Sequence, residues 1–402
     1  MFELVDSVQD KPVIKVIGVG GGGGNAVKHM IASEVGGVDF ICANTDAQAL
    51  KDVEAQTILQ LGNTITRGLG AGANPDVGRQ SALEDRERIA EVLTGADMVF
   101  ITAGMGGGTG TGGAPIVAEI AKDLGILTVA VVTRPFMIEG RKRTTVAEEG
   151  ILELRDKVDS LITIPNDRLL EVLGNKITMK AAYREADNVL LGAVQGIADL
   201  MIRPGIMNVD FADVRTVMSE MGMAMMGSGA AVGENRAREA AEKAVRSPLL
   251  DNVNLQGARG ILVNIITGSE DAGCQELTLG EYSEVGQIVQ EIASDDATVV
   301  IGTAVDDKLG DEMRVTVVAA GLGEASAQAA RPTKVVDNTR RPEAREAARA
   351  AAPAETAREP QDVRGSRVES DRSKPRSMPP LNPADQDMEY LDIPAFLRRQ
   401  AD

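Results

Sequence analysis

The segment MVFITAGMGGGTGTGG, residues 98–113, joins an apolar strand pattern to a glycine loop, and the helix pattern APIVAEIAKDLG follows at residues 114–125. Such a loop gathers main-chain N–H groups at the positive end of a helix dipole, where an anion is stabilised. The segment therefore predicts an anion-binding loop at the carboxyl end of a buried strand.

A second glycine loop lies near the amino terminus, where the strand pattern VIKVIGVG (residues 13–20) runs into Gly20–Gly24, Asn25 and a helix pattern. Gly18, Gly20 and Gly23 also fit the dinucleotide pattern G-x-G-x-x-G, which is a weak signal inside a glycine run. Two such loops on strands of one sheet can enclose a phosphate chain. The chain has no G-x-x-x-x-G-K-[ST] motif and neither loop carries a lysine, so charge compensation is expected from amides, hydroxyls such as Thr109, and Mg²⁺.

The first half of the chain alternates strand and helix patterns. Strand patterns at residues 40–45, 98–104 and 127–133, with a helical stretch near 76–93, predict an α/β fold with a parallel sheet and helices on both faces. Residues 177–202 read as one long, largely apolar helix joining two domains. Strand patterns at 261–267, 297–305 and 313–322 predict a second sheet in a smaller α+β domain.

Composition excludes several classes of protein. Residues 1–330 hold 28 Lys and Arg against 47 Asp and Glu, which argues against nucleic acid as the main ligand. No apolar run approaches the roughly 20 residues of a membrane span, and the first residues lack a signal-peptide pattern. With two cysteines and one histidine in the chain, neither a disulfide framework nor a His/Cys zinc site is expected. The low cysteine count instead predicts a protein of the reducing cytoplasm.

The end of the chain has a different composition. Nine of the 16 prolines follow residue 330, and residues 331–388 hold no aromatic side chain. Such a segment buries too little apolar area to offset its ordering entropy, so residues 326–388 are predicted to be a disordered linker. An apolar cluster returns in EYLDIPAFLRRQAD, and residues 389–402 are predicted to be a docking peptide.

Several motifs together carry a resemblance to a known family. GMGGGTGTGGAP resembles the tubulin-superfamily signature. With GVGGGGGNAV, NTDAQAL, GLGAGANPDVG, ITIPNDRLL and GIMNVDFADVR, in that family's order, the chain closely resembles the FtsZ family of bacterial cell-division GTPases. The similarity covers residues 10–325 and resumes at LDIPAFLRRQAD.

The resemblance implies a domain order and an assembly. It implies a flexible N-terminus (1–12), a GTP-binding domain (13–176), a central helix (177–202), a C-terminal domain (203–325), the linker, and an adaptor-binding tail. It further implies head-to-tail filaments of this chain that form a ring at the mid-cell division site in the cytoplasm.

Carried over residue by residue, the resemblance also implies the nucleotide-binding positions. These are Gly20, Gly21, Gly22, Gly23, Gly24, Asn25, Asn44, Ala71, Gly72, Gly104, Gly107, Gly108, Thr109, Gly110, Thr133, Pro135, Glu139, Arg143, Asn166, Tyr183 and Asp187. A carboxylate at Asp187 can accept hydrogen bonds from N1 and N2 of guanine, whereas the corresponding edge of adenine offers no such donors. Tyr183 stands where the family usually has Phe, and Met137-Ile138 departs from its frequent Asn-Phe.

A separate acidic motif is expected to act in hydrolysis. Asp210 and Asp213, spaced i to i+3, open a helix and would serve as ordinary caps. The resemblance instead implies that Asn208, Asp210 and Asp213 act on the GTP of the next subunit. No single subunit would then contain a complete active site.

The implied ligands are GTP or GDP, with Mg²⁺ bound through the phosphates and no side chain assigned as a metal ligand. The implied partners are further copies of the chain, assembly regulators, and membrane-anchored adaptors of the FtsA or ZipA type, with neither nucleic acid nor direct membrane insertion. The tail residues for the adaptors are Leu391, Asp392, Ile393, Pro394, Phe396, Leu397 and Arg398. Two alternatives stay open: a dinucleotide oxidoreductase, and a non-hydrolysing, membrane-associated relative of the family.

Overall fold

The computed structural model describes residues 11–174, 176–220, 222–250, 257–269, 273–294 and 296–322. The predicted linker, the tail residues Leu391–Arg398 and the first ten residues of the predicted N-terminal segment lie outside these ranges. Within them, none of the helices combines the length and hydropathy needed to cross a bilayer.

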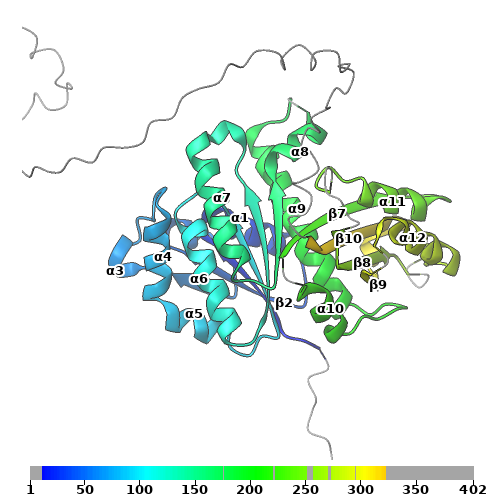
Figure 1. The fold of residues 1–402 in the computed structure, drawn as a ribbon, viewed down its shortest axis with the longest axis horizontal. Helices are drawn as coiled ribbons and strands as arrows, with labels where there is room; N and C mark the ends of the chain where they lie inside the picture. The colour runs from blue at the N-terminus through cyan, green and yellow to red at the C-terminus, as the bar shows by residue number, and fades with distance from the viewer. Residues whose placement is uncertain are drawn as a thin grey trace, which may run out of the picture. The chain divides into compact units, whose positions relative to one another are not determined.

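One ten-stranded sheet runs through the described chain in the order β3-β2-β1-β4-β5-β6-β7-β10-β8-β9. Figure 1 shows its strands with helices packed around them. Its strands are β1 (Ile14–Val19), β2 (Val38–Asn44), β3 (Thr57–Gln60), β4 (Met98–Gly104), β5 (Leu127–Arg134), β6 (Ser160–Pro165), β7 (Gly222–Ala231), β8 (Gly260–Thr267), β9 (Thr298–Val305) and β10 (Met313–Leu322). Neighbouring strands are parallel except where β10 pairs with β7 and with β8. The predicted α/β class is confirmed, with a mixed rather than wholly parallel sheet.

The expectation of a separate second sheet is wrong. β6 pairs in parallel with β7, Ser160 opposite Gly222 and Ile162 opposite Ala224, so the later strands continue the first sheet. The strand that makes this junction, GMAMMGSGAA, was not recognised, because its glycines and alanines lack the β-branched character of a typical strand.

Helices cover both faces of the sheet. They are α1 (Gly20–Ala32), α2 (Ala47–Lys51), α3 (Asn63–Thr66), α4 (Pro75–Glu84), α5 (Arg86–Leu93), α6 (Thr109–Asp123), α7 (Arg141–Arg155), α8 (Asn166–Leu173), α9 (Met179–Ile202), α10 (Phe211–Met218), α11 (Arg236–Val245) and α12 (Leu279–Ile292), with short 3₁₀ turns at Met137–Glu139 and Asp307–Leu309. Alternate strand residues separate the layers: Val16 packs with α1 and α9, whereas Ile17 packs with the α5 and α6 side. Continuously apolar strands are required by this double coverage.

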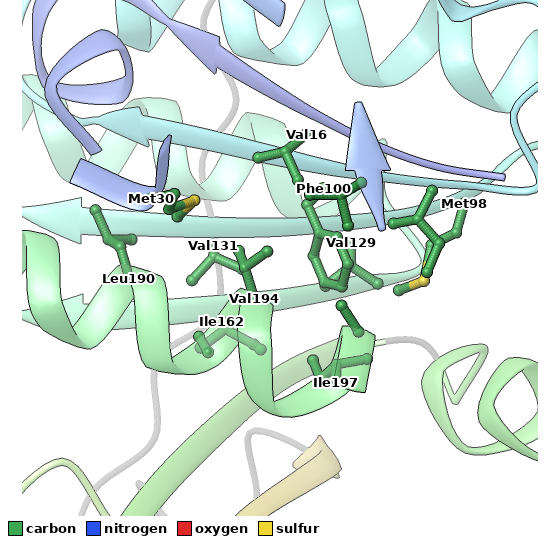
Figure 2. Close-up of a cluster of buried hydrophobic side chains, with 14 of the residues drawn as sticks. Val16, Met30, Met98, Phe100, Val129, Val131, Ile162, Leu190, Val194 and Ile197 are labelled. Atoms are coloured by element: carbon green, nitrogen blue, oxygen red, sulfur yellow. The ribbon is translucent and has the colours of Figure 1, made fainter. Parts of the chain in front are cut away.

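The long helix α9 is the spine of the described chain, as predicted. Leu190, Val194 and Ile197 lie in one buried cluster with Val129 and Val131 of β5 (Figure 2). The same cluster includes side chains from β7, β8 and β10, so one face of α9 serves both halves of the sheet. Its beginning is fixed by Thr178, whose hydroxyl accepts a hydrogen bond from the Ala181 N–H at 3.3 Å.

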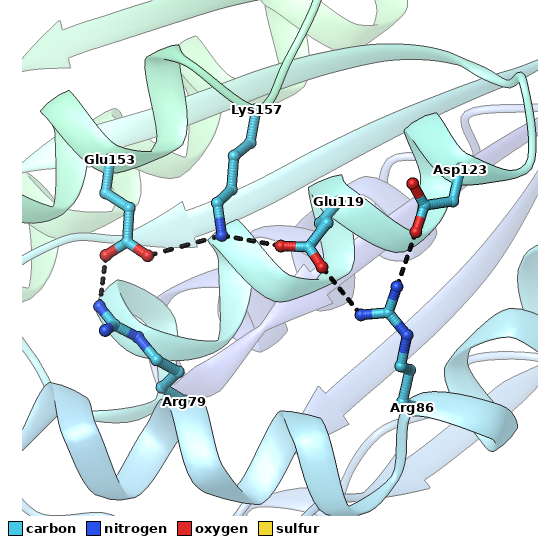
Figure 3. Close-up of polar contacts among 6 residues, drawn as sticks. All are labelled: Arg79, Arg86, Glu119, Asp123, Glu153 and Lys157. Carbon is cyan, nitrogen blue, oxygen red and sulfur yellow. Dashed lines mark hydrogen bonds and ion pairs between the residues drawn. The ribbon is translucent and has the colours of Figure 1, made fainter.

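The opposite face carries α4, α5, α6 and α7, which a chain of ion pairs connects (Figure 3). Arg79 pairs with Glu153, Lys157 bridges Glu153 and Glu119 at 3.6 and 3.0 Å, and Arg86 joins Glu119 to Asp123 at 3.0 and 2.6 Å. Lys157 and then Arg86 hold the pKa of Glu119 below its usual value. These groups are partly exposed, so the network restrains helix positions more than it adds stability.

The predicted helical stretch near 76–93 is two helices rather than one. Asp85 separates α4 from α5, and its Oδ2 accepts a hydrogen bond from the Gly62 N–H at 2.7 Å. A side chain of this kind competes with the helical backbone for hydrogen bonds.

The strands of the second half alternate between two cores. In β10, Val318 and Ala320 face the α9 cluster, whereas Val315 and Val317 pack with α11 and α12. Arg236 is fully buried in this region and satisfied by Glu281 at 2.7 Å and by the carbonyls of Asp311 and Glu276, both at 3.0 Å. It joins α11 to α12 and to the segments at Glu276 and Asp311.

Candidate functional site

The first glycine loop joins β1 to α1 and leaves amide groups open. Among the described residues, no side chain caps the start of α1. Gly20 has a φ of +75°, and a Cβ there would lie 2.9 Å from the N atom of Gly110 in the second loop. Gly21 and Gly24 face open space. The loop thus combines a contact that only glycine permits with uncapped N–H donors.

The second glycine loop, between β4 and α6, packs against the segment that precedes α4. The Gly108 N–H donates to the Gly72 carbonyl at 3.0 Å. A Cβ on Gly108 would lie 2.5 Å from that carbonyl oxygen and 2.9 Å from the Cβ of Ala71. Since Gly110 also meets Gly20, three predicted segments converge at the carboxyl edge of the parallel strands.

Other glycines in these loops serve packing. A Cβ on Gly112 would approach the Pro75 carbonyl oxygen to 1.9 Å, and one on Gly78 would approach the Gly108 carbonyl oxygen to 2.2 Å. These contacts let α4 lie directly on α6. Gly22 and Gly104 are similarly close, with a Cβ on Gly22 3.0 Å from the Gly104 Cα, and a Cβ on Gly23 would meet the Thr102 carbonyl oxygen at 2.2 Å.

Thr109 begins α6, and its hydroxyl lies 2.6 Å from the Thr45 hydroxyl in a buried contact. One of two paired hydroxyls donates to the other, which leaves the acceptor's own hydrogen for a further oxygen. Thr45 was missed from the sequence, although it stands inside the quoted motif NTDAQAL. Thr66 also donates to the Thr45 carbonyl at 3.2 Å, which fixes that segment.

A cavity of about 440 Å³ adjoins the second loop and collects four predicted residues, Gly72, Gly107, Glu139 and Arg143. It is also lined by Ala73, Gly106, Gly140, Lys142 and Val146. A smaller cavity of about 280 Å³ beside the first loop is lined by the predicted Gly20, Gly21, Gly24, Asn25 and Asn44, and also by Lys28.

Two lysines, Lys28 and Lys142, therefore lie near the glycine loops. Sequence reasoning missed both of these lysines. Lys28 follows Gly24 by four residues and so lies on the same face of α1, a signal that helix periodicity could have given. Lys142 is next to the predicted Arg143 near the start of α7. Positive charge near the glycine loops is thus supplied by the helices that follow them or stand beside them.

Glu139 organises the rim of the larger cavity. Its Oε1 accepts the Phe136 N–H at 2.9 Å, and its Oε2 lies 3.1 Å from the Arg143 guanidinium. Tyr183 packs edge-on against Phe136, with ring centroids 5.2 Å apart, and its hydroxyl lies near the Glu139 carboxylate. Burial and then the Glu139 charge raise the pKa of Tyr183. The hydroxyl that distinguishes this chain from the family pattern therefore has Glu139 as its neighbour.

Two polar side chains lie on the α8 and α9 side, of which Asp187 is half-buried and Asn166 is buried. Burial raises the pKa of Asp187 to about 6, against a smaller opposing effect of His29. Asn166, the first residue of α8, is buried and its Oδ1 has no hydrogen-bond partner among the described residues. A buried acceptor without a partner is costly, which is typical of a group that meets a ligand. Thr133, near the end of β5, accepts the Met105 N–H on its carbonyl at 3.0 Å, and Pro135 directly follows that strand.

The acidic motif lies at the opposite edge of the sheet. Asp210 lines a cavity of about 470 Å³ together with Lys11, three residues before β1, and Asp97, directly before β4. β4 has seven residues, so the two edges are roughly 20 Å apart. Asp210 and Asp213 therefore cannot reach the glycine loops of their own chain.

The acidic residues also do local structural work. The Asp210 Oδ1 accepts the Asp213 N–H at 2.8 Å, which caps α10, and the Asn208 Oδ1 accepts the Gly205 N–H at 3.0 Å. The cap interpretation is thus correct for Asp210. Asp210 and Asp213 are nevertheless exposed, so each has carboxylate oxygens free to meet another molecule. In the described ranges, no group of three His, Cys, Asp or Glu side chains could hold a metal ion.

Comparisons with known proteins agree with this arrangement. Residues 13–174 match the Tubulin/FtsZ family, GTPase domain, and residues 222–323 match the FtsZ family, C-terminal domain. A cell division protein FtsZ of Pseudomonas aeruginosa is 62% identical over 409 residues, covering 100% of both chains, and one of Coxiella burnetii is 58% identical over 400 residues, covering 99% of both. A solved structure described as an empty FtsZ dimer from M. jannaschii superimposes with a TM-score of 0.73 at 43% identity, covering 77% of this chain and 88% of that one.

Proposed function

This chain belongs to the FtsZ family of the tubulin superfamily, and from that premise we propose how its two separated sites act together. It is a GTPase of bacterial cell division that assembles with itself. In our proposal one subunit binds GTP at the carboxyl edge of its sheet, and Asp210 and Asp213 of the next subunit complete the hydrolytic site. The supporting observation is the placement of the two sets of residues on opposite edges of one sheet.

The bound nucleotide would use main-chain donors first. The uncapped amides at the start of α1 and α6 point to where the phosphates would lie, and Ala71 and Gly72 would close over the γ-phosphate. Thr109 and the nearby Lys28 and Lys142 would add hydroxyl and positive charge. Mg²⁺, with its preference for oxygen ligands, would be held by phosphate oxygens and water and would neutralise part of the phosphate charge.

The base and ribose would be recognised by side chains. Asp187 as a carboxylate would accept hydrogen bonds from guanine N1–H and N2–H, and the Tyr183 ring would stack on the base. Glu139 and Arg143, already paired at 3.1 Å, would meet the ribose and the adjacent phosphate region. The unpartnered Oδ1 of Asn166 would find a donor in the bound nucleoside.

Hydrolysis would begin when a neighbouring subunit docks. A carboxylate of Asp210 or Asp213 would accept a hydrogen bond from a water molecule and orient its oxygen toward the γ-phosphorus. The new oxygen–phosphorus bond would form as the bond from that phosphorus to the bridging oxygen breaks, leaving GDP and inorganic phosphate. Positioning of this kind is the main contribution a protein makes to phosphoryl transfer.

Nucleotide choice tests the proposed function most directly. Light scattering by the full-length protein is expected to rise with GTP and Mg²⁺ but to stay flat with ATP or with NADH. Assembly driven by NADH would favour the dinucleotide alternative, and assembly driven equally by ATP would remove the role given to Asp187. Assembly without phosphate release would favour a non-hydrolysing relative.

The tail residues Leu391, Asp392, Ile393, Pro394, Phe396, Leu397 and Arg398 would bind membrane-anchored adaptors of the FtsA or ZipA type and bring the filaments to a mid-cell ring. Deleting residues 389–402 is therefore expected to preserve GTP turnover and assembly while mid-cell fluorescence of a tagged protein is lost. A truncated protein that cannot assemble in solution would instead place the tail in the filament contact.

A further inference from the structure

The acidic segment, residues 203–210, ends at Asp210 and lies along the edge of the sheet. It joins the end of α9 to the start of α10, and β9 is the last strand in the sheet order. An edge strand has main-chain groups that no further strand satisfies. In β9 these groups are used to hold the acidic segment.

Thr303 of β9 makes the central contacts. Its hydroxyl oxygen accepts the Met207 N–H at 2.8 Å, and its own N–H donates to the Met207 carbonyl at 3.0 Å. Both main-chain groups of Met207 are therefore tied to one residue that is 96 positions away in the chain. Thr303 is 4% exposed, and its hydroxyl's bond to Met207 is partly buried.

Two glycines set the register of this contact. A Cβ on Gly205 would lie 1.8 Å from the Thr303 carbonyl oxygen, and a Cβ on Gly302 would lie 2.5 Å from the Val209 Cγ2. A shift of the segment along β9, or away from it, would therefore break the contacts of Gly205 with Thr303 and of Gly302 with Val209. Its beginning is fixed too, because Arg203 lies 2.8 Å from Asp199 and 3.3 Å from Asp306.

Burial of side chains does little to hold the middle of the segment. Ile206 is 59% exposed and Met207 is 49% exposed. With so little apolar area buried there, the position of the backbone depends on the bonds to Thr303. Asn208 and Asp210 follow Met207 within three residues, so a displaced Met207 would move both.

We propose that Thr303 is a positioning residue for GTP hydrolysis: its hydroxyl holds the acidic segment at the height and register from which Asp210 meets the nucleotide of the next subunit. This inference rests on the shared site proposed above. It adds a residue of the edge strand, distant in sequence from both the glycine loops and the acidic motif, to the determinants of turnover.

The experiment compares full-length variants by three measurements: affinity for a fluorescent GTP analogue, assembly with a slowly hydrolysed analogue, and phosphate release per assembled subunit. Thr303→Val removes the hydroxyl with little change of shape, and Thr303→Ser restores it. Thr316→Val is the matched control, because Thr316 is equally buried at 4% in β10 and its hydroxyl contacts Ser228 instead. Thermal midpoints are recorded for all variants.

Thr303→Val is expected to keep nucleotide affinity and assembly while turnover per assembled subunit falls roughly tenfold or more, since small displacements of a positioned group have effects of this size. Thr303→Ser should recover most of the turnover. Thr316→Val should lose turnover only to the extent that a lowered thermal midpoint accounts for. Equal losses in Thr303→Val and Thr316→Val would overturn the proposal, because the effect would then be one of stability.

A second variant covers the case in which Thr303→Val does not fold. Gly205→Ala adds one methyl group between the segment and the Thr303 carbonyl outside the core, and it should lower turnover with affinity unchanged. Normal turnover in Gly205→Ala and Thr303→Val, with Asp210→Asn inactive, would overturn the positioning role and leave the shared site standing. Normal turnover in Asp210→Asn would overturn the shared site itself.

Discussion

The two edges of the sheet are built in opposite ways. At the carboxyl edge the glycine loops touch one another through the main chain, as where Gly20 meets Gly110 and Gly108 meets Gly72. At the amino edge the acidic side chains stand in solvent on a segment held by a few hydrogen bonds. From this difference we expect the proposed phosphate site to be sensitive to atoms added at its close contacts, such as Gly20 and Gly108, and the proposed hydrolytic site to be sensitive to the chemistry of single side chains.

The largest effect is expected from adding one atom at the crowded edge. In Gly108→Ala the new Cβ would lie 2.5 Å from the Gly72 carbonyl oxygen, so the loop must move and GTP binding should fall below detection by calorimetry. Gly36→Ala is the control, because a Cβ there meets nothing within 4 Å and its φ is ordinary. Wild-type GTP affinity in Gly108→Ala would show that the carboxyl edge accommodates an added methyl group. The proposed difference between the two edges would then be wrong.

At the amino edge, GTP turnover should depend on the charge of a side chain rather than on its size. Asp210→Asn keeps the oxygen that caps α10 but loses the carboxylate, so stability, GTP affinity and assembly should persist while turnover falls by about 10²-fold, the scale of a positioned catalytic group. Phosphate release at matched polymer mass measures this.

Mixing sharpens the same comparison. Subunits of Thr109→Val, defective in nucleotide binding, still present a normal acidic segment and should restore some hydrolysis to Asp210→Asn subunits in mixed filaments. Activity that is strictly additive at every ratio, with mixed filaments formed, would contradict a site shared between chains.

A smaller effect is expected at Asp187, the half-buried side chain that we propose to meet the base. Asp187→Asn turns one acceptor into a donor facing the donors of guanine, and losing a charged hydrogen bond costs roughly 1.5–3 kcal/mol, or about 10- to 100-fold in affinity. The same substitution should raise the thermal midpoint of the nucleotide-free protein at pH 7, because it removes a carboxylate that burial disfavours.

The pH dependence of this site follows from the raised pKa of Asp187, about 6. The folded, nucleotide-free state binds the proton more tightly than the unfolded chain does, so this group lowers stability as the pH rises from about 4 to 6. In the proposed site GTP binds to the carboxylate form, so GTP affinity should instead fall as the pH drops below about 6. The pH dependence of affinity is measured by titration with a fluorescent GTP analogue. Equal profiles for wild type and Asp187→Asn would show that Asp187 does not bind the base.

The smallest effect is expected from Tyr183→Phe, which removes only the hydroxyl near Glu139 and keeps the edge-on contact with Phe136. One hydrogen bond contributes about 0.5–1.5 kcal/mol, so GTP affinity should fall by roughly two- to tenfold. Glu139→Gln in the same background tests the pair through a double-mutant cycle. Strict additivity of the two changes would show that Tyr183 and Glu139 act independently.

Much of the fold was predictable because its strands are strongly patterned. β4 and β10 begin and end where the apolar runs predict, and α9 is the single long helix expected. β7 was missed, because a methionine- and glycine-rich segment has weak local preference and becomes a strand through pairing with β6 and β10. The separate second sheet was predicted wrongly for the same reason.

The site was predictable to the extent that its chemistry is carried by consecutive residues. The family and the GTPase function predicted from the motifs are confirmed. The roles given to individual residues stay predictions, but the structure does bring Gly72, Gly107, Glu139 and Arg143 to one cavity. Lys28, Thr45 and Lys142 were missed, since each stands beside a motif without being part of its pattern.

The sequence by itself determined the local chemistry of this protein: two glycine loops before helices, an acidic helix start, and the strands that present them. These follow from neighbouring residues, because main-chain conformation, capping and strand pattern are local properties. The tertiary structure alone decided that the two chemistries stand on opposite edges, that Tyr183 meets Glu139, and that Thr303 holds Met207. Such contacts join residues far apart in the chain, and only the packing of the whole sheet and its helices brings them together.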